Sequence, residues 1–394
     1  MTRAYLDHNA TTTLRPEAAQ AVLRALEMTG NPASVHGEGR AARKLIENAR
    51  VDVARLVNAA PANVTFTSGG TEANHLALHA ALAHGVRRIL MSSIEHEAMR
   101  APAEACGLPV TLLPADKDGV VEREYLAREL TAGEGKPLVI LMLANNETGV
   151  IQPVAQAARL THEAGGLIIT DAVQAAGKIP VDIVSSGVDM LTLAGHKIGA
   201  PMGVGALVHR KGLAIAALQI GGGQEQRRRA GSENVSAIAG MAAAARVARE
   251  NLADMSRLRE LRDAFEARMA AAFPDMVFFG NKAERLPNTS YFAMPGLEAE
   301  RLLMALDLDG VAVSAGAACS SGKIGKPRVL AAMGVDDALA RNAIRLSLGW
   351  TSCQEDIDAF VAAWTRLHAR TVARDPLRET TDAGAAPRLA EAGR

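Results

Sequence analysis

The sequence predicts an α/β fold, in which a large domain built on a mostly parallel β-sheet is followed by a smaller α+β domain. In the first two-thirds of the chain, short apolar segments alternate with helical ones, as in parallel sheets with helical crossovers. Several apolar segments end in polar or glycine-rich motifs, and open α/β sheets bind ligands at the carboxyl ends of their strands. We expect the large domain over residues 15–255, the small domain over 1–14 and 256–370, and a disordered tail over 371–394.

Local signals place the individual elements. Pro16 and Glu17 begin a helix that continues to about Met28, because proline and acidic residues favour the first helical turn. Periodicity and β-branched residues predict the rest of the large domain: helices at about 39–58, 73–84 and 237–249, and strands at 64–67, 88–92, 138–144, 167–170 and 189–194. The pattern changes after Met255 to a long Arg/Glu/Leu helix, strands at 277–279, 289–292, 311–314 and 343–349, and a helix at 298–308.

Composition excludes several classes of protein. The formal net charge is zero and aromatic residues make up 3% of the chain, which argues against a nucleic-acid binder or a charged membrane-surface protein. The chain contains no apolar run of the roughly 18 residues that a transmembrane helix needs, and its start lacks the apolar core of a signal peptide. Its three cysteines are too few and too scattered for a disulfide framework or a resident metal cluster, so we expect a cytoplasmic protein.

The most informative stretch is a buried strand that ends in Gly195-His196-Lys197. A lysine at the mouth of such a strand is costly to desolvate unless it loses its charge or gains a partner. A covalent bond to the aldehyde of pyridoxal phosphate would resolve this cost. Asp171 ends an earlier strand and supplies the acid that would keep the pyridine nitrogen of that cofactor protonated. The alternative is a strand-end lysine that reaches into solvent.

A second motif, Ser68-Gly69-Gly70-Thr71-Glu72, lies between a predicted strand and a predicted helix. A turn of this kind exposes backbone N–H groups at the positive end of a helix dipole, which suits a phosphate group. The hydroxyl of Thr71 can add a further donor. Many strand–helix turns carry two glycines without binding any ligand, so the motif alone leaves both interpretations open.

Polar residues also follow two other strands. His96 could lie flat on a pyridine ring and exchange protons, or belong to a polar cluster at a helix N-terminus. Asn145 and Asn146 suit hydrogen bonding to a ring hydroxyl or a carboxylate, and equally suit a plain turn.

Cys319 differs from the other two cysteines because it lies among small residues, in Ala315-Gly316-Ala317-Ala318-Cys319-Ser320-Ser321-Gly322. Such a segment should be mobile and open, and a mobile thiol beside a lysine-bound cofactor suggests chemistry on sulfur. The alternative is a Gly/Ser-rich connection in which cysteine stands in for serine. Cys106 and Cys353 are interpreted as ordinary residues of a helix end or a loop.

Together these segments resemble the cysteine desulfurases of the class-V aminotransferase family, which include the nitrogen-fixation and iron–sulfur-assembly types. The resemblance covers about residues 5–365. The motifs that carry it occur in the family's order: Leu6-Asp7-His8-Asn9-Ala10-Thr11-Thr12, Gly30-Asn31-Pro32, Thr67-Ser68-Gly69-Gly70-Thr71-Glu72, Glu95-His96, Asn145-Asn146-Glu147-Thr148-Gly149, Gly195-His196-Lys197, Gly231-Ser232-Glu233-Asn234 and Ile344-Arg345-Leu346-Ser347-Leu348-Gly349. The resemblance implies a fold-type I pyridoxal-phosphate transferase with a mixed, mostly parallel seven-stranded sheet. The cysteine segment is similar to that of the family's longer-loop group.

The resemblance also implies a role for each site residue. Lys197 would bind the cofactor aldehyde, Asp171 would pair with the ring nitrogen, and His96 would stack on the ring. Gln174 would bond the ring hydroxyl, and Arg345 with Asn146 would bind the substrate carboxylate. The phosphate would be held by residues from three segments: Gly70, Thr71, Ala194, His196 and Ser232, the last from the neighbouring subunit of a homodimer. Cys319 would take the sulfur of L-cysteine as a persulfide and deliver it either to an iron–sulfur scaffold or for use in tRNA thiolation. Cys319 could also transiently share a cluster with such a scaffold.

Three departures from the family pattern stand out. Ala194 replaces a serine whose hydroxyl usually contacts the phosphate, and a hydrogen bond to a charged group contributes about 1.5–3 kcal/mol, so the phosphate should be held less tightly. Ser232 replaces a common threonine and keeps the hydroxyl. The tail after residue 370 does not resemble the family's partner-binding terminus, so the sulfur acceptor is left open.

Two other functions compete with this interpretation. A selenocysteine lyase, an aminotransferase or another pyridoxal-phosphate lyase could use the same fold. A cofactor-free interaction protein on a degenerate enzyme fold is the second alternative, and the presence of both Asp171 and Lys197 argues against it.

Overall fold

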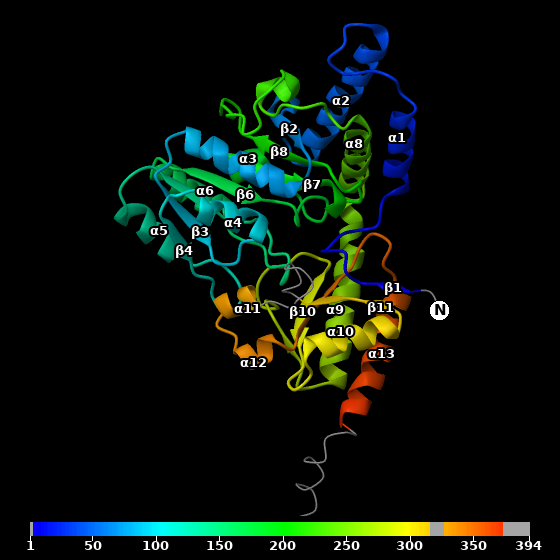
Figure 1. Cartoon of the computed structure of the whole chain (residues 1–394). Coiled ribbons are helices and arrows are strands. Elements are labelled where there is room, and N and C mark those ends of the chain that lie inside the picture. The colour runs from blue at the N-terminus through cyan, green and yellow to red at the C-terminus, as the bar shows by residue number, and fades with distance from the viewer. Residues whose placement is uncertain (1–2, 316–326, 373–394) are drawn as a thin grey trace, which may run out of the picture.

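A computed structural model describes residues 3–315 and 327–372 (Figure 1). The predicted thiol Cys319 and the tail from residue 373 lie outside the described residues. The described chain contains a seven-stranded sheet, a four-stranded sheet and a two-stranded sheet.

The seven-stranded sheet confirms the predicted fold class. Its strands lie in the order β2 (Val64–Thr67), β8 (Gly205–His209), β7 (Met190–Ala194), β6 (Leu167–Asp171), β5 (Pro137–Ile140), β3 (Arg88–Ser92) and β4 (Val110–Leu113). Strand β8 runs antiparallel to both of its neighbours, and every other pair in this sheet is parallel.

Helices cover both faces of this sheet, which is why its central strands are buried along their whole length. Every residue of β6 and β7 is buried. Alternate side chains belong to different hydrophobic clusters: Ile168 packs with helices α2 and α8, whereas Ile169 packs with α3 and α4. In Figure 1, α1, α2 and α8 gather on one side of the sheet.

The helices begin and end as follows: α1 (Pro16–Leu26), α2 (Gly37–Leu56), α3 (Gly70–Ala83), α4 (Glu97–Ala105), α5 (Arg123–Ala132), α6 (Val154–Glu163), α7 (Ile183–Ser186), α8 (Val235–Glu250), α9 (Met255–Ala272), α10 (Ala299–Leu308), α11 (Arg328–Ala332), α12 (Asp337–Ala340) and α13 (Gln354–Val372). Short 3₁₀ helices lie at η1 (Pro61–Asn63), η2 (Gly195–Lys197), η3 (Gln224–Arg227) and η4 (Leu252–Asp254). No helix of the described ranges is long and apolar enough to cross a bilayer.

The four-stranded antiparallel sheet has its own core. Its order is β12 (Ser314–Ala315), β13 (Ala343–Ser347), β10 (Thr289–Ala293) and β9 (Val277–Phe278). Phe292 of β10 packs against Phe265 of α9 with ring centroids 5.5 Å apart, and against Trp364 of α13 at 5.8 Å. Aromatic residues are rare in this chain, so their concentration here indicates where the second core forms.

The N-terminal segment packs with this second unit. Strand β1 (Ala4–Tyr5) pairs in parallel with β11 (Val311–Ala312), and Asp7 forms a bridge with Ser347. These contacts support the proposed assignment of residues 1–14 and 256–370 to one small domain, which remains a proposal.

Two predicted strands differ most in extent from the observed ones. The run Val311–Ser314 is divided between two sheets, because β11 pairs with β1 whereas Ser314 pairs with Arg345 of β13. The strand predicted to reach Ala144 ends at Ile140. The residues after it are apolar because they are buried, and their backbone groups bond individually, as Leu143 N does to the carbonyl of Asp171 at 2.9 Å.

Candidate active site

A cavity of about 510 Å³ lies at the carboxyl ends of β6 and β7. It is lined by most of the residues singled out from the sequence: Gly70, Thr71, His96, Asn146, Asp171, Gln174, Ala194, His196, Lys197 and Arg345. Ser232 does not line it and is exposed on the loop between η3 and α8. Cys319 lies outside the described residues, so its position relative to the cavity stays a prediction.

Lys197 is placed by the 3₁₀ turn that directly follows β7. Its Nζ atom donates to the carbonyl oxygen of Asn9 and to that of Ala10, the latter at 2.7 Å. Both acceptors belong to the N-terminal segment, which therefore closes one side of the cavity. The amine of this half-buried lysine is thus held at the cavity by two backbone carbonyls.

Asp171 is buried at the end of β6, and its carboxylate is fixed on both oxygens. Oδ1 accepts from the backbone N–H of Val173 at 2.9 Å, and Oδ2 accepts from Asn74 Nδ2 at 3.0 Å. The amide of Asn74 is itself oriented by Thr192 Oγ1, which donates to its Oδ1 at 2.6 Å. A carboxylate held in this way can keep a proton on a ring nitrogen. Sequence analysis missed Asn74, whose only signal was a polar residue in an Ala/Leu-rich helix.

The N-terminus of α3 meets the requirements of an anion site. The N-cap residue is Gly69, which has no side chain that could cap the helix. The cavity wall is tight beside it: a Cβ atom at Gly70 would lie 3.2 Å from Val173 Cγ2 and 3.4 Å from Ala194 Cβ. A helix N-terminus without a side-chain cap and a close backbone approach suit a phosphate. Ala194 borders the same wall with a methyl group and contributes no donor.

Two histidines line the cavity in their neutral form. Burial, followed by the charge of Lys197, lowers the pKa of His196 to about 4, and its Nδ1 lies 3.2 Å from Thr11 Oγ1. Burial also lowers the pKa of His96, against the opposing effect of Asp171. Nδ1 of His96 accepts from the N–H of Ala98 at 3.1 Å, so the proton of the neutral ring lies on Nε2. His96 is therefore both the N-cap of α4 and a wall of the cavity, and the two interpretations of it are compatible.

The two adjacent asparagines have different roles. Asn145 forms the turn, since its Oδ1 accepts from the N–H groups of Glu147 and Thr148, each at 2.9 Å. Asn146 borders the cavity, and its backbone carbonyl accepts from Arg345 Nη1 at 2.9 Å. The structure thus separates the structural amide from the one that can reach a ligand.

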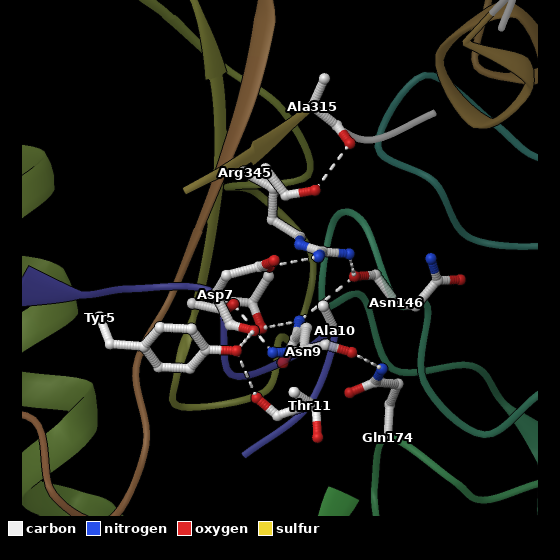
Figure 2. Close-up of polar contacts among 12 residues, drawn as sticks. Tyr5, Asp7, Asn9, Ala10, Thr11, Asn146, Gln174, Ala315 and Arg345 are labelled. Carbon is white, nitrogen blue, oxygen red and sulfur yellow. Dashed lines mark hydrogen bonds and ion pairs between the residues drawn. The ribbon is translucent and has the colours of Figure 1, made fainter. Parts of the chain in front are cut away.

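Arg345 reaches the cavity from β13 and is already paired. Its Nη2 donates to Asp7 Oδ1 at 2.6 Å, and the guanidinium lies between Asp7 and Asn146 (Figure 2). Its buried Nε has no hydrogen-bond partner among the described residues. A carboxylate that binds here would share the guanidinium with Asp7.

A buried acid stands directly before His96. Glu95 Oε1 accepts from Met142 N at 2.6 Å, whereas Oε2 has no hydrogen-bond partner among the described residues. Burial, with a smaller contribution from the charge of Asp171, raises the pKa of Glu95 from 4.5 to about 8. The carboxyl group is therefore protonated at neutral pH.

This protonation makes stability depend on pH. Between the pKa of the unfolded chain, 4.5, and about 8, the folded state holds a proton that the unfolded state has lost. Stability should therefore fall as pH rises through this window, by about 1.4 kcal/mol per pH unit. Glu95→Gln removes the titration and should remove this part of the slope, measured by urea unfolding at about pH 6 and pH 7.5. Equal slopes in variant and wild type would contradict the assignment.

Comparisons with known proteins agree with this geometry. The family model for aminotransferase class-V matches residues 4–360. A cysteine desulfurase of Cereibacter sphaeroides is 44% identical over 364 residues, which cover 90% of this chain and 93% of the relative. The cysteine desulfurase NifS of Azotobacter vinelandii is 38% identical over 369 residues, which cover 92% and 91%. A solved NifS-like protein from Rickettsia africae superposes with a TM-score of 0.86 at 33% identity, over 93% of this chain and 99% of that chain.

Proposed function

Because the chain belongs to the class-V aminotransferase family, we propose that it is a cysteine desulfurase. In this reaction L-cysteine is converted to L-alanine, and its sulfur is transferred to Cys319 as a persulfide. Pyridoxal phosphate is the cofactor of the family.

One observation carries the proposal: the lysine, the acid and the uncapped helix N-terminus meet in a single cavity. These are the three groups that pyridoxal phosphate requires, for its aldehyde, its ring nitrogen and its phosphate. The residues present therefore fit the cofactor, and the absence of a hydroxyl at Ala194 removes only one of several donors.

When bound, the cofactor withdraws electrons from the Cα atom of an amino acid attached to it. The protein's own groups would do the rest. Lys197 would hold the aldehyde and, as a free amine, would remove the Cα proton. Asp171 would keep the ring nitrogen protonated, His96 would stack on the ring and Gln174 would bond the ring hydroxyl. Gly70, Thr71 and His196 would hold the phosphate.

The substrate would be oriented by its carboxylate, through Arg345 and Asn146. The thiolate of Cys319 would attack the sulfur of L-cysteine, forming an S–S bond as the Cβ–S bond breaks. The electron pair of the broken bond stays with the three-carbon product, which gains a proton and leaves as L-alanine. Cys319 then carries the sulfur to its acceptor.

The test is to incubate the cofactor-loaded protein with L-cysteine and dithiothreitol. We expect alanine and sulfide in equal amounts, and none from protein stripped of the cofactor. L-Selenocysteine turned over in strong preference to L-cysteine would instead identify a selenocysteine lyase. Transfer of the amino group to a 2-oxo acid, without alanine release, would identify an aminotransferase.

Several parts of the proposal concern partners. The acceptor would be an iron–sulfur scaffold or another sulfur-acceptor protein. A homodimer would bring Ser232 of one subunit to the phosphate site of the other, and the exposure of Ser232 outside its own cavity supports this arrangement. The homodimer and the cytoplasmic location stay predictions.

A further inference from the structure

Beside the cavity lies a second buried lysine to which the reaction assigns no role. Lys178 is 9% exposed and follows Gln174 by four residues. Its Nζ atom donates to Gln174 Oε1 at 2.7 Å and to Asn9 Oδ1 at 3.0 Å. Both acceptors are neutral amide oxygens. These contacts therefore orient two amides and form no ion pair.

The hydrogen bond from Lys178, together with one to Asn9, fixes the orientation of the Gln174 side-chain amide. Lys178 donates to its oxygen, and its Nε2 donates to the carbonyl of Asn9 at 2.9 Å (Figure 2). A carbonyl can only accept a hydrogen bond, so the two partners agree on one orientation. The second N–H of Nε2 is then available to a ligand in the cavity that Gln174 lines.

Asn9 connects Lys178 to Asn288, Thr289 and Lys197 through hydrogen bonds. Its Oδ1 also accepts from Asn288 Nδ2 at 3.0 Å, and its Nδ2 donates to Thr289 Oγ1 at 2.9 Å. The backbone carbonyl of the same residue accepts from Nζ of Lys197. A displacement of Asn9 would therefore move the acceptor that holds the reactive lysine.

We propose that Lys178 is a positioning residue for the cofactor: it holds Gln174 and Asn9 so that an amide N–H faces the ring hydroxyl while Lys197 stays in place. The inference rests on the proposed function in one respect, that pyridoxal phosphate binds in this cavity. Burial, together with the charges of Lys197 and Arg345, lowers the pKa of Lys178 well below its ordinary value. An amine and an ammonium both have the two N–H groups that the contacts need, so the role holds in either state.

The test is a double-mutant cycle on cofactor affinity. Lys178→Met keeps the apolar stem and removes both donors, which should leave the Gln174 amide held only by the carbonyl of Asn9. The dissociation constant of pyridoxal phosphate, titrated by visible absorbance without any amino acid, should rise about tenfold. In a Gln174→Ala background the same change should raise the dissociation constant by a clearly smaller factor, because the share that Lys178 exerts through that amide is already lost. Lys211→Met, at an exposed lysine, is the matched control and should leave affinity unchanged.

Two results would overturn the inference. One is an unchanged dissociation constant in Lys178→Met. The other is the same loss of affinity in both backgrounds, which would show that Lys178 does not act through Gln174. If Lys178→Met does not fold, as judged by the thermal midpoint of the apoprotein, Lys178→Gln retains a donor and takes its place in the cycle. Failure of the wild type to take up the cofactor would refute the proposed function instead, so the two failures can be distinguished.

Discussion

Lys197→Ala is expected to remove both the covalent cofactor and the activity. The variant loses the amine that would hold the aldehyde and remove the Cα proton, and a positioned general base alone contributes about 10²–10⁴-fold to rate. We therefore expect alanine formation to fall by at least about 10³-fold. Borohydride reduction followed by intact-mass measurement should show the cofactor attached to the wild type and absent from the variant.

Lys197→Arg is the matched control for this experiment. The guanidinium can still donate to the carbonyls of Asn9 and Ala10, so the N-terminal segment keeps its contacts. It stays charged at any working pH and forms no covalent bond to the aldehyde. Arginine should therefore preserve the thermal midpoint of the apoprotein and still lose activity. Attachment of the cofactor in either variant, at the wild-type mass increment, would show that another amine is the reactive one.

The core of this site could be predicted from the sequence because strand topology determines it. Asp171 and Lys197 each end an apolar run, and parallel neighbouring strands bring such ends to one edge. The Gly-Gly-Thr turn could be interpreted in the same way, since it joins a strand to a helix. Local sequence signals were enough to predict the parts of the site that are built from consecutive strands and the turns after them.

The supporting hydrogen bonds could not be predicted, because they join positions far apart in the chain. Asn9 contacts Lys178 across 169 positions and Asn288 across 279. Neither asparagine lies in a periodic segment, and nothing in the sequence around either one indicates which residue it contacts. Lys178 follows a glycine in what resembles an ordinary surface turn, so its burial is visible only once the N-terminal segment is in place. The same reason explains the strand over 311–314, whose halves pair with partners that local pattern does not specify.

The reaction should also depend on Cys319, and Cys319→Ala is expected to block the transfer of sulfur from L-cysteine to the protein. Without the thiolate, nothing attacks the substrate sulfur, so alanine and sulfide release should fall by at least about 10²-fold. None of the proposed cofactor contacts involves this residue, so the visible absorbance of the purified variant should match the wild type. The assay is the L-cysteine and dithiothreitol incubation, followed by detection of protein-bound persulfide.

The other two cysteines provide controls whose reactivity the structure predicts to be low. Cys106 is partly buried, and its Sγ donates to the carbonyl of Ala103 at 3.1 Å. Cys353 is exposed, but its hydrogen bond with Glu355 raises the pKa of the thiol, so little thiolate forms at neutral pH. Cys106→Ala and Cys353→Ala should therefore keep wild-type turnover. Full turnover by Cys319→Ala, together with loss in Cys353→Ala, would assign the persulfide to Cys353 and reject Cys319 as the nucleophile.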